Sequence, residues 1–413
     1  MLVNPGARLI DGRTGEVLAG AELRTRVEAA AVPDEPGPVF LPLPVSVESV
    51  VRYIAALESG RPVALLDPAL PEETLKEIYA RFGGAECHPD LGLLLATSGS
   101  TGSPKLVRLS RAAILANAES IAQSLDIDAD EVAITTLPFF YSYGMSVLNS
   151  HLLRGATIVV DDRGYLDKGF WAAVESLGVT SLAGVPYQYE MLRRVGFDPA
   201  KYPALRTLTQ AGGRLRPQLV ADFAARMATV GGRMYVMYGQ TEAGPRMAVL
   251  PPDQITEKVG SAGLPVPGGR FTIEGELGEV VYHGPNVMMG YAETAADLAK
   301  GDELGGVLHT GDLGRLDEDG FLFLTGRTKR IGKVFGVRLN LDDVERMLDV
   351  PAAAVSGNDK IVVWVEGTPA DDLATTLAER LNVHHSGLRV RGIDKLPLLG
   401  NGKVDYQALE RQA

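Results

Sequence analysis

The chain has 413 residues, 46% hydrophobic and 22% charged, which is enough apolar material for the cores of two or three domains. Its net charge of −12 argues against nucleic acid as a partner, because binding to a phosphate backbone needs a basic face. A single cysteine, Cys87, excludes an internal disulfide and a metal site of clustered cysteines.

No apolar run approaches the ~18 residues of a membrane span. The first residues, MLVNPGARLIDGRTGEV, contain no basic segment followed by an apolar block, so no secretion signal is expected. Together with the single cysteine, these features favour a cytoplasmic location.

Residues 1–90 are predicted to form a leader before the main α/β part. Apolar residues at helical spacing between Val47 and Leu57 predict a helix. A short apolar strand follows at Pro62–Leu66, closed by Asp67 and Pro68, and a second helix leads toward residue 90.

A glycine-rich loop follows the apolar stretch Leu91–Ala96, which reads as a buried strand. The loop, Thr97–Lys105, has the sequence TSGSTGSPK. Glycines let backbone N–H groups converge on an anion, and the hydroxyls and the lysine add donors, so this segment predicts a phosphate-binding loop. The patterns GxxxxGK[ST] and GxGxxG are absent. A flexible linker is the alternative, but a linker has no need to follow a buried strand.

Strands and helices then alternate, which predicts a mainly parallel α/β sheet. Leu106–Leu109 can return from the loop as a strand, and Ser110 is a candidate N-cap for the next helix. The other predicted elements are strands at Ala156–Val160, Ser181–Val185, Arg206–Gln210 and Arg233–Met237, and a helix at Phe170–Leu177.

From Gly260 onward the sequence pattern changes to short predicted strands separated by glycines. The sequence DEDG at Asp317–Gly320 predicts a turn between the strands Leu313–Leu316 and Phe321–Leu324. A helix at Leu341–Leu348, a strand at Ile361–Val365 and a helix after Asp372 predict a final α+β lobe. The expected division is a large domain of residues 1–328, comprising leader 1–90, α/β core 91–259 and β-rich part 260–328, and a small lobe of residues 329–413.

Four further motifs follow the glycine-rich loop. They are YGQTEA at Tyr238–Ala243, GEVVYHGPNVMMGY at Gly278–Tyr291, HTGDLGRLDEDGFLFLTGRTKR at His309–Arg330 and LPLLGNGKVDY at Leu396–Tyr406. In kind and order, the five resemble the motifs of the adenylate-forming superfamily, which includes acyl-CoA synthetases, adenylation domains of peptide synthetases and luciferases. The resemblance implies a large N-terminal α/β domain with a parallel sheet and a β-rich subdomain, followed by a small mobile C-terminal α+β domain. Members of the family usually have a longer leader.

The resemblance also implies an activity. The enzyme would use ATP and Mg²⁺ to convert a small carboxylic acid to an acyl-adenylate, release pyrophosphate, and pass the acyl group to a pantetheine thiol. The short leader and final lobe favour a stand-alone enzyme of a specialised pathway. The thiol would belong to coenzyme A or to an acyl or peptidyl carrier protein. Transfer to an amine or another non-thiol nucleophile is the alternative, and a nucleotide-binding protein without catalysis is less favoured because Lys105, Glu242, Asp312 and Lys403 are all present.

By resemblance, the glycine-rich loop holds the β- and γ-phosphates through Ser98, Ser100, Thr101, Gly102 and Lys105. The family usually has glycine where this chain has Leu106.

The second motif, YGQTEA, would supply further contacts to ATP and Mg²⁺. Tyr238 would lie against adenine, Thr241 would contact the α-phosphate, and Glu242 would bind Mg²⁺, an ion that prefers oxygen ligands. Gly212 and Gly213 resemble a glycine turn beside the adenine, although a generic turn explains them equally well.

The last two motifs contain the remaining ATP-site predictions. Asp312 would accept hydrogen bonds from both ribose hydroxyls, and Arg327 would contact the ribose or a phosphate. Lys403 would contact the carboxylate and the α-phosphate during adenylation. Lys329 stands at the family's hinge position, about which the final lobe would rotate, and Gly336 would then let the thiol arm pass. Taken singly, Asp312 reads as a turn residue, and Lys329 and Lys403 as surface charges.

The segment LPFFYSYGMSV at Leu137–Val147 resembles the part of the family beside the acyl pocket. Many acyl-CoA synthetases have histidine where this chain has Tyr141, and adenylation domains for amino acids usually have aspartate close to the place of Ser142. Because a buried ammonium without a carboxylate is costly, an acid lacking an α-amino group is favoured. Val185, Tyr187 and Met237 are further pocket candidates, with ordinary core packing as an equal alternative.

Overall fold

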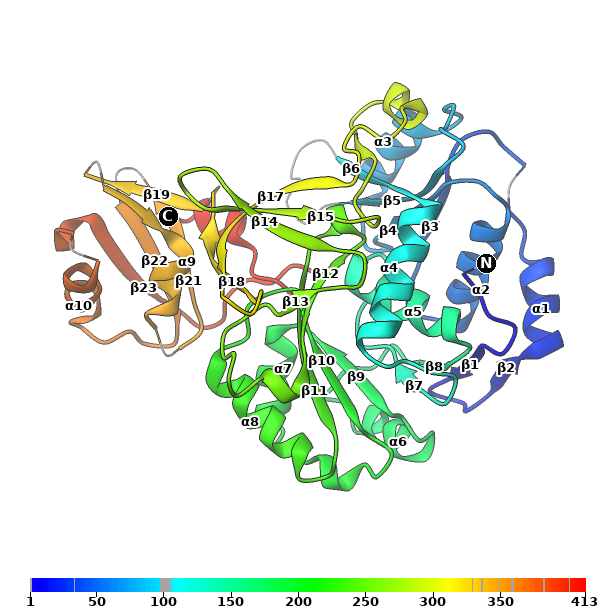
Figure 1. Ribbon diagram of the computed structural model, residues 1–413, viewed down its shortest axis with the longest axis horizontal. Helices are drawn as coiled ribbons and strands as arrows, with labels where there is room; N and C mark the ends of the chain where they lie inside the picture. The colour runs from blue at the N-terminus through cyan, green and yellow to red at the C-terminus, as the bar shows by residue number, and fades with distance from the viewer. Residues whose placement is uncertain are drawn as a thin grey trace. The chain divides into compact units, whose positions relative to one another are not determined.

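A long mixed sheet runs through the first part of the chain (Figure 1). The computed structural model describes residues 2–32, 34–96, 105–328, 330–335, 337–348, 350–357, 360–381, 383–400 and 402–413. The chain divides into two compact units, one of residues 1–271 and 282–308 and the other of residues 272–281 and 309–413.

The large sheet of the first unit has the strand order β13-β12-β11-β10-β9-β7-β8-β1-β2. Its neighbours from β1 to β11 pair in parallel, whereas β2, β12 and β13 pair antiparallel at the two edges. The strands are β1 (Arg8–Asp11), β2 (Val17–Ala19), β7 (Val132–Ile134), β8 (Thr157–Val160), β9 (Ser181–Gly184), β10 (Thr207–Gln210), β11 (Arg233–Gly239), β12 (Arg246–Leu250) and β13 (Leu264–Pro265). The predicted parallel α/β sheet is confirmed.

A second sheet of the first unit has the order β16-β6-β5-β4-β3. Its strands are β3 (Val39–Pro42), β4 (Val63–Leu66), β5 (Leu91–Ala96), β6 (Leu106–Ser110) and β16 (Gly290–Ala292). The predicted phosphate loop joins the antiparallel neighbours β5 and β6. The residues before β5 supply strands to both sheets, so the leader is an integral part of the first unit.

Helices cover the sheets of the first unit, as Figure 1 shows. They are α1 (Gly20–Ala29), α2 (Val47–Glu58), α3 (Glu72–Phe82), α4 (Arg111–Ser124), α5 (Ser142–Arg154), α6 (Lys168–Ser176), α7 (Pro186–Arg194) and α8 (Pro217–Ala228). The predicted cap of α4 is confirmed, because the Ser110 hydroxyl accepts a hydrogen bond from the Ala113 N–H at 3.0 Å. Short 3₁₀ turns are η1 (Pro199–Lys201), η2 (Thr241–Ala243), η3 (Pro252–Gln254), η4 (Ala295–Ala299) and η5 (His385–Gly387), the last in the second unit.

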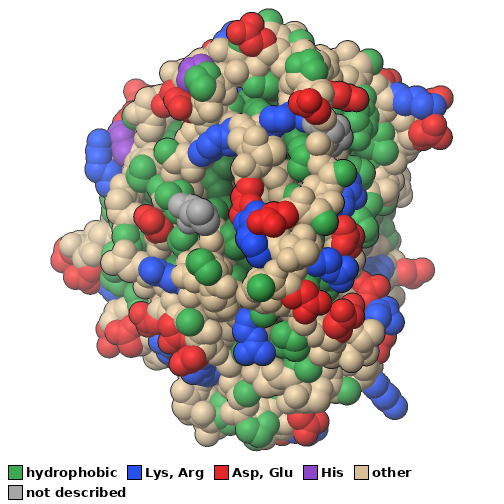
Figure 2. Space-filling view, turned by 90° about the vertical axis from the view of Figure 1, so that its right-hand side faces the viewer, with side chains coloured by type: hydrophobic (Ala, Val, Ile, Leu, Met, Phe, Trp, Pro, Cys, Tyr) green, Lys and Arg blue, Asp and Glu red, His purple; other side chains and the backbone are tan. Residues whose placement is uncertain are grey.

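On the face of the first unit drawn in Figure 2, basic and acidic side chains lie among one another. Arg24 of α1 pairs with Glu58 of α2 at 2.7 Å. None of the helices in the described part of the chain combines the length and the apolar content that a bilayer crossing requires.

A buried apolar cluster of the first unit positions the site described below. It brings side chains of α4 and α5 against β9 and β11, and includes Ile121, Tyr141, Tyr143, Val185 and Met237. Burying a large side chain of this kind contributes about 1.5–3 kcal/mol. The cluster therefore fixes α5 firmly over the carboxyl halves of these strands.

The β-rich sheet has the order β14-β15-β17-β18, with β14 (Arg270–Glu274), β15 (Glu279–His283), β17 (Val307–Leu316) and β18 (Leu322–Arg327). The predicted hairpin at Asp317–Gly320 is confirmed: the Asp317 carboxylate accepts a hydrogen bond from the Phe321 N–H at 2.8 Å, and Gly320 has a φ of 84°. Two other strands of the segment 260–328 pair elsewhere, since β13 joins the large sheet and β16 joins the second one.

The end of the chain forms the predicted α+β structure of the second unit. Its elements are β19 (Ile331–Val334), β20 (Val337–Asn340), α9 (Leu341–Arg346), β21 (Ala352–Gly357), β22 (Lys360–Glu366), α10 (Leu373–Arg380), β23 (Leu388–Ile393) and α11 (Tyr406–Glu410). The strands β21, β22 and β23 form one sheet, and α9 and α10 cover part of it with an apolar core around Val344 and Leu377.

A partly buried charge cluster joins several elements of the second unit around Arg330. The Arg330 guanidinium lies 2.6 Å from Asp342 and 2.6 Å from Glu345, and its central carbon lies 3.8 Å from the centre of the Tyr406 ring. Burial raises the pKa of Glu345, and the charge of Arg330 opposes that rise. Arg330 therefore compensates two partly buried carboxylates at the junction of β19, α9 and α11.

Replacing Arg330 with methionine is expected to destabilise the second unit by about 3 kcal/mol, because it leaves Asp342 and Glu345 without their counter-charge. Arg346→Met is the control: Arg346 pairs with Asp343 at a more exposed position, where a pair contributes about 0–1 kcal/mol. Denaturant unfolding of both variants is the measurement. Equal losses of stability would contradict the importance of the Arg330 cluster.

Candidate active site

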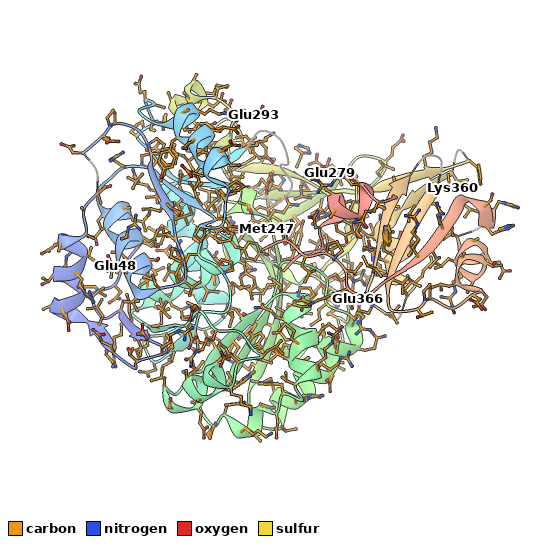
Figure 3. The ribbon with its side chains drawn as sticks, turned by 180° about the vertical axis from the view of Figure 1, so that it is seen from behind. Glu48, Met247, Glu279, Glu293, Lys360 and Glu366 are labelled. Atoms are coloured by element: carbon orange, nitrogen blue, oxygen red, sulfur yellow. The ribbon has the colours of Figure 1, made fainter. Side chains whose placement is uncertain are left out.

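Lys105 ends the predicted phosphate loop and is the one residue of that prediction within the described part of the chain. Ser98, Ser100, Thr101 and Gly102 lie outside the described residues. The Lys105 Nζ lies 3.3 Å from a carboxylate oxygen of Glu293, which Figure 3 labels, and 3.7 Å from the centre of the Tyr291 ring. The Lys105–Glu293 pair is exposed and therefore weak, so an arriving phosphate can replace Glu293.

Tyr291 connects this lysine to the predicted magnesium ligand. Its hydroxyl donates a hydrogen bond to Glu242 Oε1 at 2.9 Å. Burial and the neighbouring Glu242 carboxylate raise the pKa of Tyr291, so the phenol stays protonated and keeps donating. Lys105, Tyr291 and Glu242 form what we call the Lys–Tyr–Glu network, and it brings three of the five motifs together.

The segment 282–291 supports the network from behind. Met288 N–H donates to the Glu242 carbonyl at 2.9 Å, and the Asn286 side-chain amide donates to the Ala243 carbonyl at 2.6 Å. Tyr282 in turn donates to Asn286 Oδ1 at 2.8 Å. The sequence motif contains Asn286 and Tyr291, but sequence reasoning assigned no role to either, because these contacts depend on tertiary structure.

The segment after β7 meets the second motif at Thr241. Ser142, the first residue of α5, and Thr241, the first residue of η2, have their hydroxyl oxygens 3.0 Å apart. Gly212 lies close by with a φ of 82°, and a Cβ there would be 2.4 Å from the Tyr141 hydroxyl. The structure thus brings Tyr141, Ser142, Gly212 and Thr241 together beyond the ends of β9–β11, where open α/β sheets bind ligands.

The other predicted first-unit residues have ordinary packed environments. Tyr238 is buried, with its ring centre 6.4 Å from that of Phe271. Val185 and Met237 belong to the same buried cluster as Tyr141, and Tyr187 packs against it. Their roles toward adenine or an acyl group stay predictions, as does that of Gly213.

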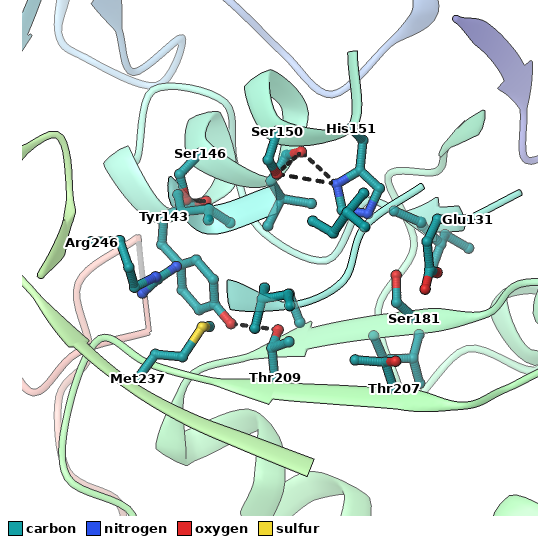
Figure 4. Close-up of a pocket in the computed structure, with 18 residues that line it drawn as sticks. Glu131, Tyr143, Ser146, Ser150, His151, Ser181, Thr207, Thr209, Met237 and Arg246 are labelled. Atoms are coloured by element: carbon teal, nitrogen blue, oxygen red, sulfur yellow. Dashed lines mark hydrogen bonds between the residues drawn. The ribbon is translucent and has the colours of Figure 1, made fainter. Parts of the chain in front are cut away.

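A cavity of about 30 Å³ lies between α5 and the strands β7, β9 and β10 (Figure 4). Met237 and Tyr143 line it, together with three buried polar atoms that have no hydrogen-bond partner: His151 Nε2, Thr207 Oγ1 and Arg246 Nε. Sequence reasoning missed all three residues. A lone histidine on an apolar helix and a threonine in a strand give no signal before the fold is known.

Arg246 is a buried cation at the edge of this cavity. It is 2% exposed, its guanidinium carbon lies 4.8 Å from the centre of the Tyr143 ring, and it forms no ion pair with a carboxylate among the residues that the structure describes. Burial lowers the pKa of Arg246. An uncompensated buried charge of this kind is typical of a site that receives a polar or anionic group.

In the second unit, the predicted pair Asp312 and Arg327 lies together. The two residues face each other in the register of β17 and β18, and Arg327 Nε donates to Asp312 Oδ1 at 2.7 Å. His309 is exposed and lies 3.4 Å from Glu279. The proposed contacts of Asp312 and Arg327 with ribose stay predictions.

Lys403 lies in a tight turn of the second unit. The Leu399 N–H donates to the Lys403 carbonyl at 2.8 Å, and Gly402 has a φ of 78°, which favours glycine. Lys329 and Gly336, the predicted hinge and thiol-passage residues, lie outside the described residues.

The fold and the site define an adenylate-forming α/β enzyme. The sequence model of the family described as AMP-binding enzyme matches residues 84–292, which span the phosphate loop and the whole Lys–Tyr–Glu network. The chain belongs to this family.

Relatives of known activity support the class. The chain is 32% identical to the feruloyl-CoA synthase of an Amycolatopsis species over 430 aligned residues, which cover 95% of this chain and 83% of that protein. It is 29% identical to the indoleacetate–CoA ligase of Aromatoleum aromaticum over 422 residues, covering 94% and 80%. The fold is that of the O-succinylbenzoate coenzyme A synthetase of Bacillus subtilis, solved in complex with ATP and magnesium ion, with a TM-score of 0.77, 21% identity, and coverage of 96% and 95%.

The chain is therefore an AMP-forming acid–thiol ligase. It activates a carboxylic acid as an acyl-adenylate, releases pyrophosphate and transfers the acyl group to a thiol. The predicted family, fold class and enzyme class are confirmed.

Tyr291→Phe is expected to raise the KM for ATP about tenfold. The substitution removes a hydrogen bond that both orients Glu242 and holds the aromatic ring beside Lys105. Tyr53→Phe is the matched control: it removes a buried phenol hydrogen bond of 2.9 Å to Asn149. Steady-state kinetics of both variants are the measurement. An unchanged KM for ATP in Tyr291→Phe would show that the Lys–Tyr–Glu network does not contribute to ATP binding.

Proposed function

We propose that this enzyme is a coenzyme A ligase for a carboxylic acid that lacks an α-amino group. The observation that carries the proposal is the Lys–Tyr–Glu network, which ends only one residue from the Thr241–Ser142 contact. The proposed phosphate-binding cation Lys105, the proposed metal ligand Glu242 and the proposed entrance to the acyl pocket at Ser142 would thereby lie beyond the carboxyl ends of the strands, where open α/β sheets bind ligands.

The first half-reaction brings two anions together. Lys105 and the glycine-rich loop would neutralise the β- and γ-phosphates, and Thr241 would hydrogen-bond the α-phosphate. The acid needs no general base, because a carboxylate is already ionised at neutral pH. Its oxygen attacks the α-phosphorus, the bond to the bridging oxygen breaks, and pyrophosphate leaves.

Mg²⁺ fits the donor set around Glu242. One carboxylate oxygen accepts the Tyr291 hydrogen bond, so the other can bind the ion. No cluster of three histidine, cysteine or acidic side chains suited to a metal occurs in the described ranges. Glu242 would therefore share Mg²⁺ with ATP phosphates and water, as is usual for this ion. When bound, the ion would stabilise the negative charge of the departing pyrophosphate.

The second unit would supply the remaining groups. Asp312 and Arg327 would bind the ribose, and Lys403 would contact the carboxylate and the α-phosphate during adenylation. A rotation about Lys329 would then separate Lys403 from the site and admit the thiol past Gly336. The thiol attacks the acyl carbonyl carbon, and AMP leaves with the electrons of the broken acyl–phosphate bond.

The acid's class follows from the groups near Ser142. Tyr141 and Thr241 are its neighbours there, and neither can pair with an ammonium ion as a carboxylate would. The acids named for the two relatives, ferulic acid and indoleacetic acid, lack an α-amino group. Their names also favour coenzyme A over a carrier protein or a non-thiol nucleophile as the acceptor.

ATP–pyrophosphate exchange across a panel of carboxylic acids tests this proposal, followed by addition of coenzyme A, a phosphopantetheinyl carrier protein or an amine. We expect exchange with acids that lack an α-amino group and thioester formation with coenzyme A. Exchange with amino acids alone, or a product with the amine only, would contradict the proposal.

Lys403→Ala is expected to lower the exchange rate about 10²–10³-fold while ATP still binds, because it removes one preorganised donor to the transition state. Lys360→Ala is the control, since Lys360 is an exposed lysine of the same unit, on β22 (Figure 3). Exchange rates and nucleotide affinity by calorimetry are the readouts, and near-normal exchange by Lys403→Ala would remove this lysine from the mechanism.

A further inference from the structure

The cavity beneath α5 contains three unsatisfied buried polar atoms, a costly arrangement. Leaving one buried donor or acceptor without a partner costs about 1–3 kcal/mol, and most such groups in folded proteins are paired. His151, Thr207 and Arg246 each contribute one of these atoms to the same cavity (Figure 4). A ligand group that enters the cavity can satisfy them.

The hydrogen bonds of His151 determine what it can accept. Its Nδ1 lies 2.8 Å from the Val147 carbonyl oxygen, which can only accept, so the ring proton is on Nδ1. Burial lowers the pKa of His151, against smaller opposing effects of the Val147 carbonyl and Glu131, so the ring is neutral. The free Nε2 is therefore a lone-pair acceptor, and it requires a donor from the ligand.

The surroundings of His151 disfavour an anion. The buried carboxylate of Glu131 lines the same end of the cavity, where it accepts a hydrogen bond from Thr180 and lies 3.8 Å from Arg206. A second carboxylate placed there would meet both Glu131 and the lone pair of His151. Thr207, in contrast, can donate or accept, and so it can complete the hydrogen bonding of a neutral hydroxyl.

The cavity lies at a definite distance from the reacting end of the acid. Ser142 and His151 are nine residues apart on α5, which corresponds to about 13 Å along a helix. Gln210 and Thr207 are three residues apart on β10, or about 10 Å along a strand. An acid that reaches the cavity from Thr241 is therefore elongated, and it would have to enter the buried cluster that contains Tyr141, Tyr143 and Met237, of which the last two line the cavity.

We propose that this cavity binds the far end of the acid, and that this end carries a neutral O–H or N–H donor on an elongated aromatic skeleton. The donor hydrogen-bonds His151 Nε2, and a hydroxyl oxygen also accepts from Thr207. The cavity volume of about 30 Å³ suits a hydroxyl-sized end group. The inference rests on the proposed function, since it assigns the acyl specificity of that same site.

The test compares matched acids in ATP–pyrophosphate exchange. The probes are 4-hydroxycinnamate, cinnamate and 4-carboxycinnamate. We expect kcat/KM to be about 10–100-fold higher for 4-hydroxycinnamate than for cinnamate, because cinnamate leaves His151 unsatisfied.

Two variants assign the preference to the cavity. Thr207→Val and His151→Leu are each expected to reduce the preference for 4-hydroxycinnamate over cinnamate to below about threefold. Ser146→Ala is the control, because Ser146 also lines the cavity but donates to the Tyr143 carbonyl at 2.7 Å. It should keep the preference. A variant that loses the preference through misfolding would also lose exchange with cinnamate.

The outcomes separate the two proposals. Exchange with none of these acids nor any other carboxylate would overturn the proposed function and this inference with it. Exchange without a preference for the acid that carries the donor would overturn this inference but not the proposed function. Water would then be the group that fills the cavity. Faster exchange with 4-carboxycinnamate would also overturn it and would assign the cavity to anion binding by Arg246. Wild-type enzyme alone decides among these results, so the test does not depend on the stability of any variant.

Discussion

Repulsion between two anions is the constraint on which the rest of this structure depends. A carboxylate cannot approach the α-phosphate of ATP unless positive charge is already fixed around both, and fixing it in advance avoids reorganisation during the reaction. In the proposed mechanism the first unit would meet this requirement with Lys105, which lies over the Tyr291 ring and forms only an exposed ion pair with Glu293. Because such a pair is weak, the cation would remain available to phosphate.

Close backbone approach is the second requirement. At Gly239 an added Cβ would lie 1.7 Å from the Pro245 carbonyl, and at Gly212 it would meet the Tyr141 hydroxyl. Both glycines stand where the chain leaves a strand of the large sheet toward the site. Side chains at these positions would push the second motif away from α5, so they are needed to bring Thr241 within hydrogen-bonding distance of Ser142.

Much of the fold could be predicted because its signals are local. The apolar run of β5, the cap at Ser110 and the turn at Asp317–Gly320 depend on residues a few positions apart, and each is found in the structure. Strand partners are not local: nothing in the sequence indicates that β1 pairs with β8, or that β16 leaves the β-rich part to pair with β6. The site divides in the same way. Lys105 and Glu242 stand in recognisable motifs. The role of Tyr291 could not be predicted, because it lies 49 residues from Glu242 in the sequence and only the fold brings the two into a hydrogen bond.

The unsatisfied atoms beneath α5 lower the stability of the fold, and a role in binding would explain why they are present. The rest of the described interior is well paired, and the one other buried side-chain atom without a partner there is the indole nitrogen of Trp364, in the second unit. Three such atoms around one small cavity therefore concentrate an unfavourable contribution to the folding free energy in one place. Apolar residues of similar size would relieve that cost without disturbing the helix or the strands, so stability alone gives no reason for them. The two atoms on His151 and Thr207 are explained if their missing partners arrive with the substrate, because binding energy from the far end of an acid can then hold its carboxylate in line with the α-phosphate.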